Sequence, residues 1–177
     1  YFLERALASG GTRNFVVTRA EPASFTHDAG ADVTVFDGHA PPAPLPPGSY
    51  LFINAVPPLE GFTRTGEEEN PVVYDWDTQH AAMRYAELSD VGIGRATVLA
   101  LPAATQVLAE SRTTPLMVAY AAANRNVLVW TFDLFDSNLP LRAAFPILVS
   151  NGVDWLMRDS ASAESVTRSP TEYTPLQ

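Results

Sequence analysis

The chain has neither cysteine nor lysine among its 177 residues. Without cysteine it has no disulfide, thiolate metal site, iron–sulfur cluster or cysteine nucleophile. Without lysine it has no Schiff-base chemistry and no phosphate-gripping lysine of the P-loop kind. Its 11 arginines face 20 aspartates and glutamates, which gives a formal net charge of −9. This balance disfavours nucleic acid as a partner, because phosphate binding needs a basic surface.

Long apolar runs are also missing, and no stretch approaches the roughly 20 residues that span a bilayer. We therefore expect no direct membrane insertion by this chain. The opening residues lack the basic start and apolar centre of a signal peptide. Hydrophobic residues make up 46% and charged residues 18% of the chain, as in globular domains. We expect one domain over residues 1–158 and a polar Ser/Thr/Pro-rich linker or tail over 159–177.

The first half of the sequence predicts a helix over 1–9 and strands over 14–18, 32–37 and 49–54. Between the last two, residues 41–47 hold five prolines and predict a stiff, extended surface connection. Because the strand-like runs are separated by crossovers, we expect a mainly parallel sheet.

The second half predicts antiparallel pairing. Residues 61–70 are expected to form a polar loop, 72–74 a short strand, and 75–90 a loop with one helical turn. Four further strand-like runs follow in close order, at 96–101, 106–110, 116–120 and 127–132. The run Val127–Trp130 is apolar throughout, which predicts a central strand covered on both faces. Apolar residues from Phe145 to Leu156 recur at helical spacing and predict one buried helix stripe.

The densest polar cluster contains Asp75, Asp77 and His80. Two carboxylates and an imidazole can hold a cation, which would allow a cryptic metal-assisted hydrolase. Their spacing matches no metal-binding signature. The simpler interpretation is that Asp77 and His80 cap or brace a loop.

Other candidate ligand-binding residues follow predicted strands, where binding groups collect in α/β proteins. Asp37 and Asn54 end two of the parallel strands, and with Asp77 and His80 they could line a pocket for a sugar or nucleotide. A simple Asx-turn is the alternative for Asp37. Asp133 and Asp136 follow the last strand, in a loop whose simpler role is to cap a turn and hold Arg142.

Motifs for covalent catalysis are missing. No serine stands in the Gly-x-Ser-x-Gly frame of a nucleophile elbow, and Gly92-Ile93-Gly94 is only half of a dinucleotide fingerprint. We assign no catalytic residue, no metal ligand and no cofactor.

The order of several segments is nevertheless recognisable. They are residues 2–7 (Phe-Leu-Glu-Arg-Ala-Leu), 32–38 with the proline loop, 132–142 and 144–151. Over residues 1–158 the chain resembles the class I glutamine-amidotransferase-like domain of bacterial membrane-anchored proteins that also carry a von Willebrand factor A domain, the aerotolerance-protein-like group.

The resemblance implies a flavodoxin-like three-layer α/β sandwich, with a parallel sheet between helices extended by antiparallel strands. It places the first strand of the fold before Tyr1. In active amidotransferases the nucleophilic cysteine sits on a tight elbow after the third parallel strand, where this chain has Asn-Ala-Val-Pro-Pro at 54–58. No catalytic residue can therefore be transferred, and His80 inherits no role.

The resemblance thus implies a pseudoenzyme: a soluble, non-catalytic binding or assembly domain of a membrane-anchored bacterial protein. Its expected partners are other domains of the same protein or a protein complex. The sequence leaves open which side of the membrane it faces.

Overall fold

The computed structural model describes residues 2–9, 15–27, 30–122 and 124–165. The elements, in chain order, are α1 (Phe2–Ser9), the 3₁₀ turn η1 (Pro22–Ser24), β1 (Thr34–Asp37), β2 (Gly48–Ile53), β3 (Thr63–Glu69), β4 (Asp75–Trp76), η2 (Ala81–Met83), β5 (Arg95–Ala100), β6 (Gln106–Glu110), β7 (Pro115–Ala122), β8 (Arg125–Trp130), η3 (Leu139–Leu141) and α2 (Ala144–Ser165).

The main sheet has six strands in the order β1-β2-β8-β7-β6-β4. Strands β1, β2 and β8 are parallel, whereas β7, β6 and β4 continue the sheet in antiparallel pairs. The predicted mixture of a parallel half and an antiparallel half is therefore confirmed. So is the central position of Val127–Trp130, because these four residues of β8 are all buried.

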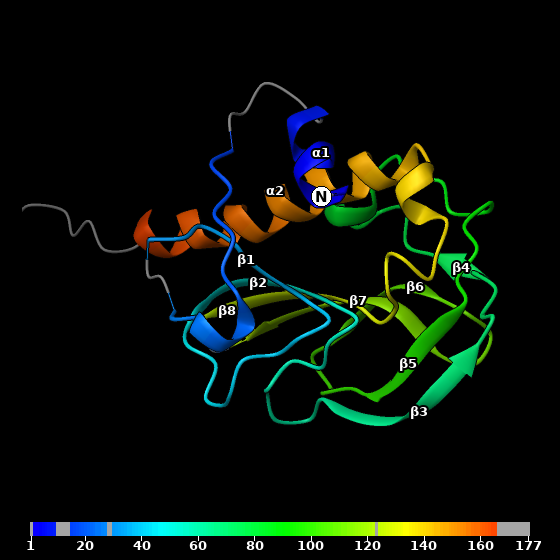
Figure 1. Ribbon diagram of the computed structural model, residues 1–177, viewed down its shortest axis with the longest axis horizontal. Coiled ribbons are helices and arrows are strands. Elements are labelled where there is room, and N and C mark those ends of the chain that lie inside the picture. Colours follow the sequence, from blue (N-terminus) through cyan, green and yellow to red (C-terminus); the bar gives the residue numbers. More distant parts are fainter. Residues whose placement is uncertain (1, 10–14, 28–29, 123, 166–177) are drawn as a thin grey trace, which may run out of the picture.

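Helices α1 and α2 cover one face of this sheet (Figure 1). The predicted apolar stripe of α2 packs there, with Leu148 and Leu156 buried against Leu51 and Leu128 in one core. The helix lies close to the sheet: a Cβ added at Gly152 would come within 3.1 Å of Leu128 Cδ1. α2 continues to Ser165, past the domain boundary expected at 158. None of the described helices is long and apolar enough to cross a membrane.

The other face is covered differently. Leu45 of the proline loop, together with Phe62 and Leu99, packs on Phe36 and Phe52 of the sheet. The ribbon formed by β3 and β5 lies on the side away from α1 and α2 (Figure 1). Within the described ranges no α-helix covers this face, so the expected helix–sheet–helix sandwich is not formed there. A strand ribbon and a proline loop bury the aromatic side chains instead.

Several predicted elements were wrong. Residues 61–70 do not form a loop, because 63–69 make up β3, which pairs with β5 rather than leaving β5 beside β6. Residues 72–74 form no strand, and only Val72 bridges to Gly92. Residues 15–18 belong to no strand or helix, and Asn14 lies outside the described residues.

Candidate functional site

The carboxyl ends of the three parallel strands form the first candidate site. Asp37 ends β1, Asn54 follows β2, and Asp133 follows β8. The backbone N–H of Asn54 donates to the Trp130 carbonyl at 2.8 Å, which ties the ends of β2 and β8 together. Adjacent parallel strands end at the same edge of a sheet. The structure therefore brings together Asp37 and Asn54, which were expected in one pocket, and adds Asp133, which was expected as a separate candidate.

Two carboxylates contribute to the electrostatics of this edge. Burial raises the pKa of the Asp37 carboxyl, and the nearby charge of Asp133 raises it further. Among the described residues, the Asp37 carboxylate accepts no backbone hydrogen bond, so the Asx-turn expected as its simpler role is not formed. Asp133 Oδ1 accepts the backbone N–H of Phe135 at 2.8 Å. Two carboxylates favour hydroxyl donors and repel phosphate.

The turn after β2 has unusual backbone geometry. Asn54 has φ +48°, in the left-handed region that asparagine tolerates better than other residues with a side chain. The chain turns sharply here, into Ala55 and Val56 and then a buried Pro57. The tight turn is thus present where the resemblance places a nucleophile, but its residues carry no thiol and no hydroxyl.

Asp77 and His80 lie at the opposite edge of the sheet. They follow β4, and β4 and β1 are the two ends of the strand order. The predicted pocket that joins these two residues to Asp37 and Asn54 is therefore wrong. The reason is that β4 pairs with β6 at the far edge, a partner that neither strand's local sequence reveals.

At this edge the polar side chains serve the chain's own backbone. Asp77 Oδ1 accepts the backbone N–H groups of Gln79 at 2.9 Å and of His80 at 3.1 Å. His80 Nδ1 accepts the Ala82 N–H at 3.2 Å and caps η2. Asp75 Oδ1 accepts the N–H of Trp76 at 2.9 Å. The loop-bracing interpretation is confirmed, and no three His, Asp or Glu side chains of the described residues are placed to hold a metal ion.

Burial lowers the pKa of His80, although Asp77 and a hydrogen bond with Gln106 act in the opposite direction. The imidazole lies against Trp155 of α2, with ring centroids 5.4 Å apart. A half-buried imidazole whose Nδ1 accepts a backbone N–H is suited to a structural role.

Asp136 lies in a loop that docks on the segment before β5. Its N–H donates to the Asp133 carbonyl at 3.2 Å, and its carboxylate lies against Gly94. Its carbonyl accepts the N–H of Gly94 at 2.7 Å, and Asn138 Oδ1 accepts the N–H of Gly92 at 2.8 Å. Arg142 forms its ion pair with Asp90 at 3.2 Å, not with the loop that was expected to hold it. This segment is a structural clamp between two loops.

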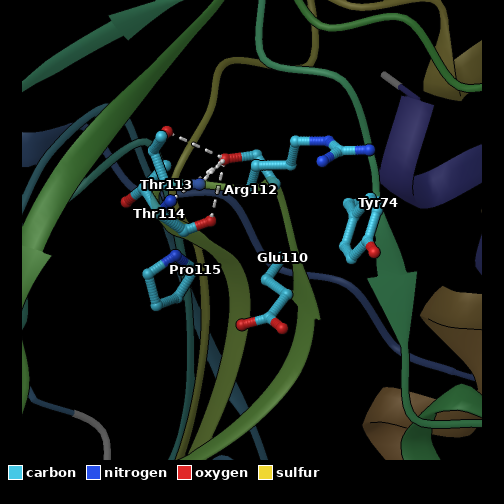
Figure 2. A pocket seen from close by; sticks show the side chains of 7 residues that line it. Tyr74, Glu110, Arg112, Thr113, Thr114 and Pro115 are labelled. Atoms are coloured by element: carbon cyan, nitrogen blue, oxygen red, sulfur yellow. Dashed lines mark hydrogen bonds between the residues drawn. The ribbon is translucent and has the colours of Figure 1, made fainter.

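A hollow of about 350 Å³ lies between Tyr74 and the β6–β7 turn, residues 110–115, and the sequence analysis did not predict it. Arg112 reaches across to Tyr74, with its guanidinium carbon 4.5 Å from the ring centroid (Figure 2). Ser111 Oγ accepts the N–H of Thr114 at 3.0 Å and donates to Glu68 at 2.8 Å. No pattern links residue 74 to this turn along the chain. The Ser111 hydroxyl, which lines this hollow, holds the turn and β3 together.

No family model matches the chain, and no curated protein matches it. Two solved structures do. One is "Cytoplasmic Protein STM3548 from Salmonella typhimurium", with a TM-score of 0.51 at 10% identity over 62% of this chain and 55% of that one. The other, "Cytoplasmic Protein STM1381 from Salmonella typhimurium LT2", has a TM-score of 0.48 at 13% identity over the same shares. The chain thus spans about half the length of these proteins, and the first similarity supports an α/β fold alone.

Proposed function

We propose that this chain is a non-catalytic binding or assembly domain, glutamine-amidotransferase-like in its arrangement but without the cysteine nucleophile. We further propose, from the sequence resemblance, that it is part of a larger membrane-anchored bacterial protein. The single observation that carries the proposal is the turn after β2. It has a residue with left-handed backbone, Asn54, at the position where the resemblance implies the nucleophile of an active amidotransferase.

The chemistry at this turn supports the proposal. Glutaminase activity needs a thiolate that attacks the amide carbon, and the side chains of residues 54–58 offer an amide, apolar groups and two proline rings. The nearest hydroxyl after β8 is that of Thr131. It is buried and bonded to the Leu116 carbonyl at 3.2 Å, so it holds strands together.

The test is a turnover assay on the purified chain. Ammonia release from glutamine and hydrolysis of p-nitrophenyl acetate and an amino-acid p-nitroanilide are measured against buffer alone. The proposal predicts rates equal to buffer. Turnover that Asp37→Asn or Asp133→Asn abolishes, while circular dichroism shows an intact fold, would overturn it.

A hydroxyl-rich small ligand is a second candidate, favoured by the grouping of Asp37, Asn54 and Asp133 at one sheet edge. The hydroxyl groups of a sugar can donate hydrogen bonds to such acceptors, whereas the phosphates of a nucleotide would be repelled by the two carboxylates. Thermal shifts in a panel of monosaccharides should then disappear in the Asp133→Asn variant and persist in Asp136→Asn, the matched control outside this group. A panel with no shift counts against this candidate.

A further inference from the structure

The outer edge of β1 has hydrogen-bonding groups with no partner. Along a strand, successive residues direct their N–H and C=O groups to opposite sides. The N–H of Gly38 donates to the Ile53 carbonyl of β2 at 2.8 Å, so Phe36 also faces β2 and Val35 and Asp37 face away. In the described part of the chain, no backbone group bonds to these two outward-facing residues.

The side chains of this strand continue both layers of the core. Phe36 is buried in the cluster under the β3–β5 ribbon, and Val33 packs against the core under the helices. Val35 shares a face with Val33 and is 39% exposed. A strand laid along this edge would find apolar contacts on both faces and main-chain partners between them.

The charges at this edge favour a basic binding partner over a second copy of the chain. Asp32 and Asp37 bracket β1, and the chain as a whole carries −9 with no lysine. Pairing with a second copy would bring these aspartates and two chains of −9 together. A segment with arginine or lysine near both of its ends meets opposite charges instead.

We propose that the outer edge of β1 binds an extended segment of a partner protein by strand addition. This segment is apolar at alternate positions and basic near both ends. The inference rests on the proposed function and deepens it, since it names the surface and the kind of partner that an assembly domain would use. Peptide binding and substrate turnover are separate measurements, so failure of one is distinguishable from failure of the other.

The test uses the peptide acetyl-Arg-Val-Thr-Val-Thr-Arg-amide, followed by ¹⁵N NMR titration of the chain. Its arginines have the same spacing as Asp32 and Asp37, so they can meet both in either direction. We expect shifts centred on the Val35 and Asp37 amides, and binding about tenfold weaker when glutamate replaces both arginines.

The matched variants are Val35→Pro and Asp37→Asn. Proline removes the outward N–H of an edge strand without touching the bonds to β2, so Val35→Pro should weaken the peptide about tenfold while the fold persists. If Val35→Pro does not fold, Asp37→Asn takes its place and should weaken binding and reduce its salt dependence.

Three results would overturn the proposal. The arginine peptide could fail to bind at millimolar concentration, or it could bind the variants as tightly as the original chain. Sedimentation could instead show a dimer that Val35→Pro dissociates, which would make a second copy the occupant.

Discussion

The two edges of the six-stranded sheet differ in whether their polar groups have hydrogen-bond partners within the described chain. At the β4 edge, the side chains of Asp75, Asp77 and His80 accept backbone N–H groups from the residues that follow them. At the β1 edge, Val35 and Asp37 direct their backbone groups outward, and the Asp37 carboxylate is near the Asp133 carboxylate and accepts no backbone N–H of the described residues.

This difference shows why residue type alone does not identify a site. Both edges have aspartates at strand ends, and the β4 edge has the richer cluster. A polar group already bonded within the fold stabilises it and is not free for a ligand. A group left without a partner is available to one. By this criterion we propose that a ligand binds at the parallel edge, whereas the polar side chains of the antiparallel edge stabilise the fold.

The largest expected effect comes from breaking the strand that both halves share. Leu128 of β8 is buried beneath α2, and Leu128→Ala should lower the free energy of unfolding by about 3 kcal/mol in urea denaturation. Val35→Ala on the exposed edge is the control, with a small loss. Two separate unfolding transitions in Leu128→Ala would show that the two halves fold independently, contrary to a single shared core.

Removal of a brace at the β4 edge should have a smaller effect. Asp77→Ala removes the acceptor of two backbone N–H groups and should cost about 1 kcal/mol of stability, as loss of a helix cap does. Asp77→Asn keeps an oxygen at that position and should lose less. Equal losses in the two variants would mean that the charge, not the acceptor, is what matters.

The pH response of His80 should follow its lowered pKa. Because the folded chain protonates this imidazole less readily than the unfolded chain does, its contribution to stability is complete above the ordinary value of 6.5. That contribution falls as the pH decreases below 6.5. The difference in unfolding free energy between the original chain and His80→Asn, which retains a capping oxygen, should therefore shrink on acidification. A difference that is constant with pH would contradict a burial-shifted histidine.

Asp37 should respond in the opposite sense and with the smallest effect. Its raised pKa means that the ionised carboxylate is disfavoured in the folded chain at neutral pH. Asp37→Asn should therefore increase stability at neutral pH, by less than about 1 kcal/mol because solvent still reaches part of this side chain and weakens the effect. The gain should disappear as the pH falls through the folded pKa. A loss of stability at neutral pH would instead indicate a stabilising bond to the carboxylate.

The elements that the sequence predicted well are those in which the polarity of the side chains matches their burial. Val127–Trp130 and the stripe of α2 are apolar because both are buried. In contrast, β3 has a polar sequence, mostly exposed side chains and no alternation, so only its pairing with β5 makes it a strand.

The candidate site residues likewise include some whose position was predicted correctly and some whose position was not. Asp37 and Asn54 were predicted to lie together because parallel strands share an edge, a rule that needs no knowledge of distant partners, whereas Asp133 was not predicted to join them. The error at Asp77 and His80 arose because their position depends on β4 pairing with β6, a choice between strands made in three dimensions.

Amide hydrogen exchange along β1, followed by NMR, tests the contrast between the two edges most directly. The account predicts an alternation within one strand. The Val35 and Asp37 amides should exchange rapidly, whereas those of Phe36 and Gly38, which face β2, should be protected. At the other edge, the amides of Trp76 and His80 should be protected because they donate to the side chains of Asp75 and Asp77. Equal protection of Val35, Phe36, Asp37 and Gly38 would contradict an open β1 edge and the binding role built on it.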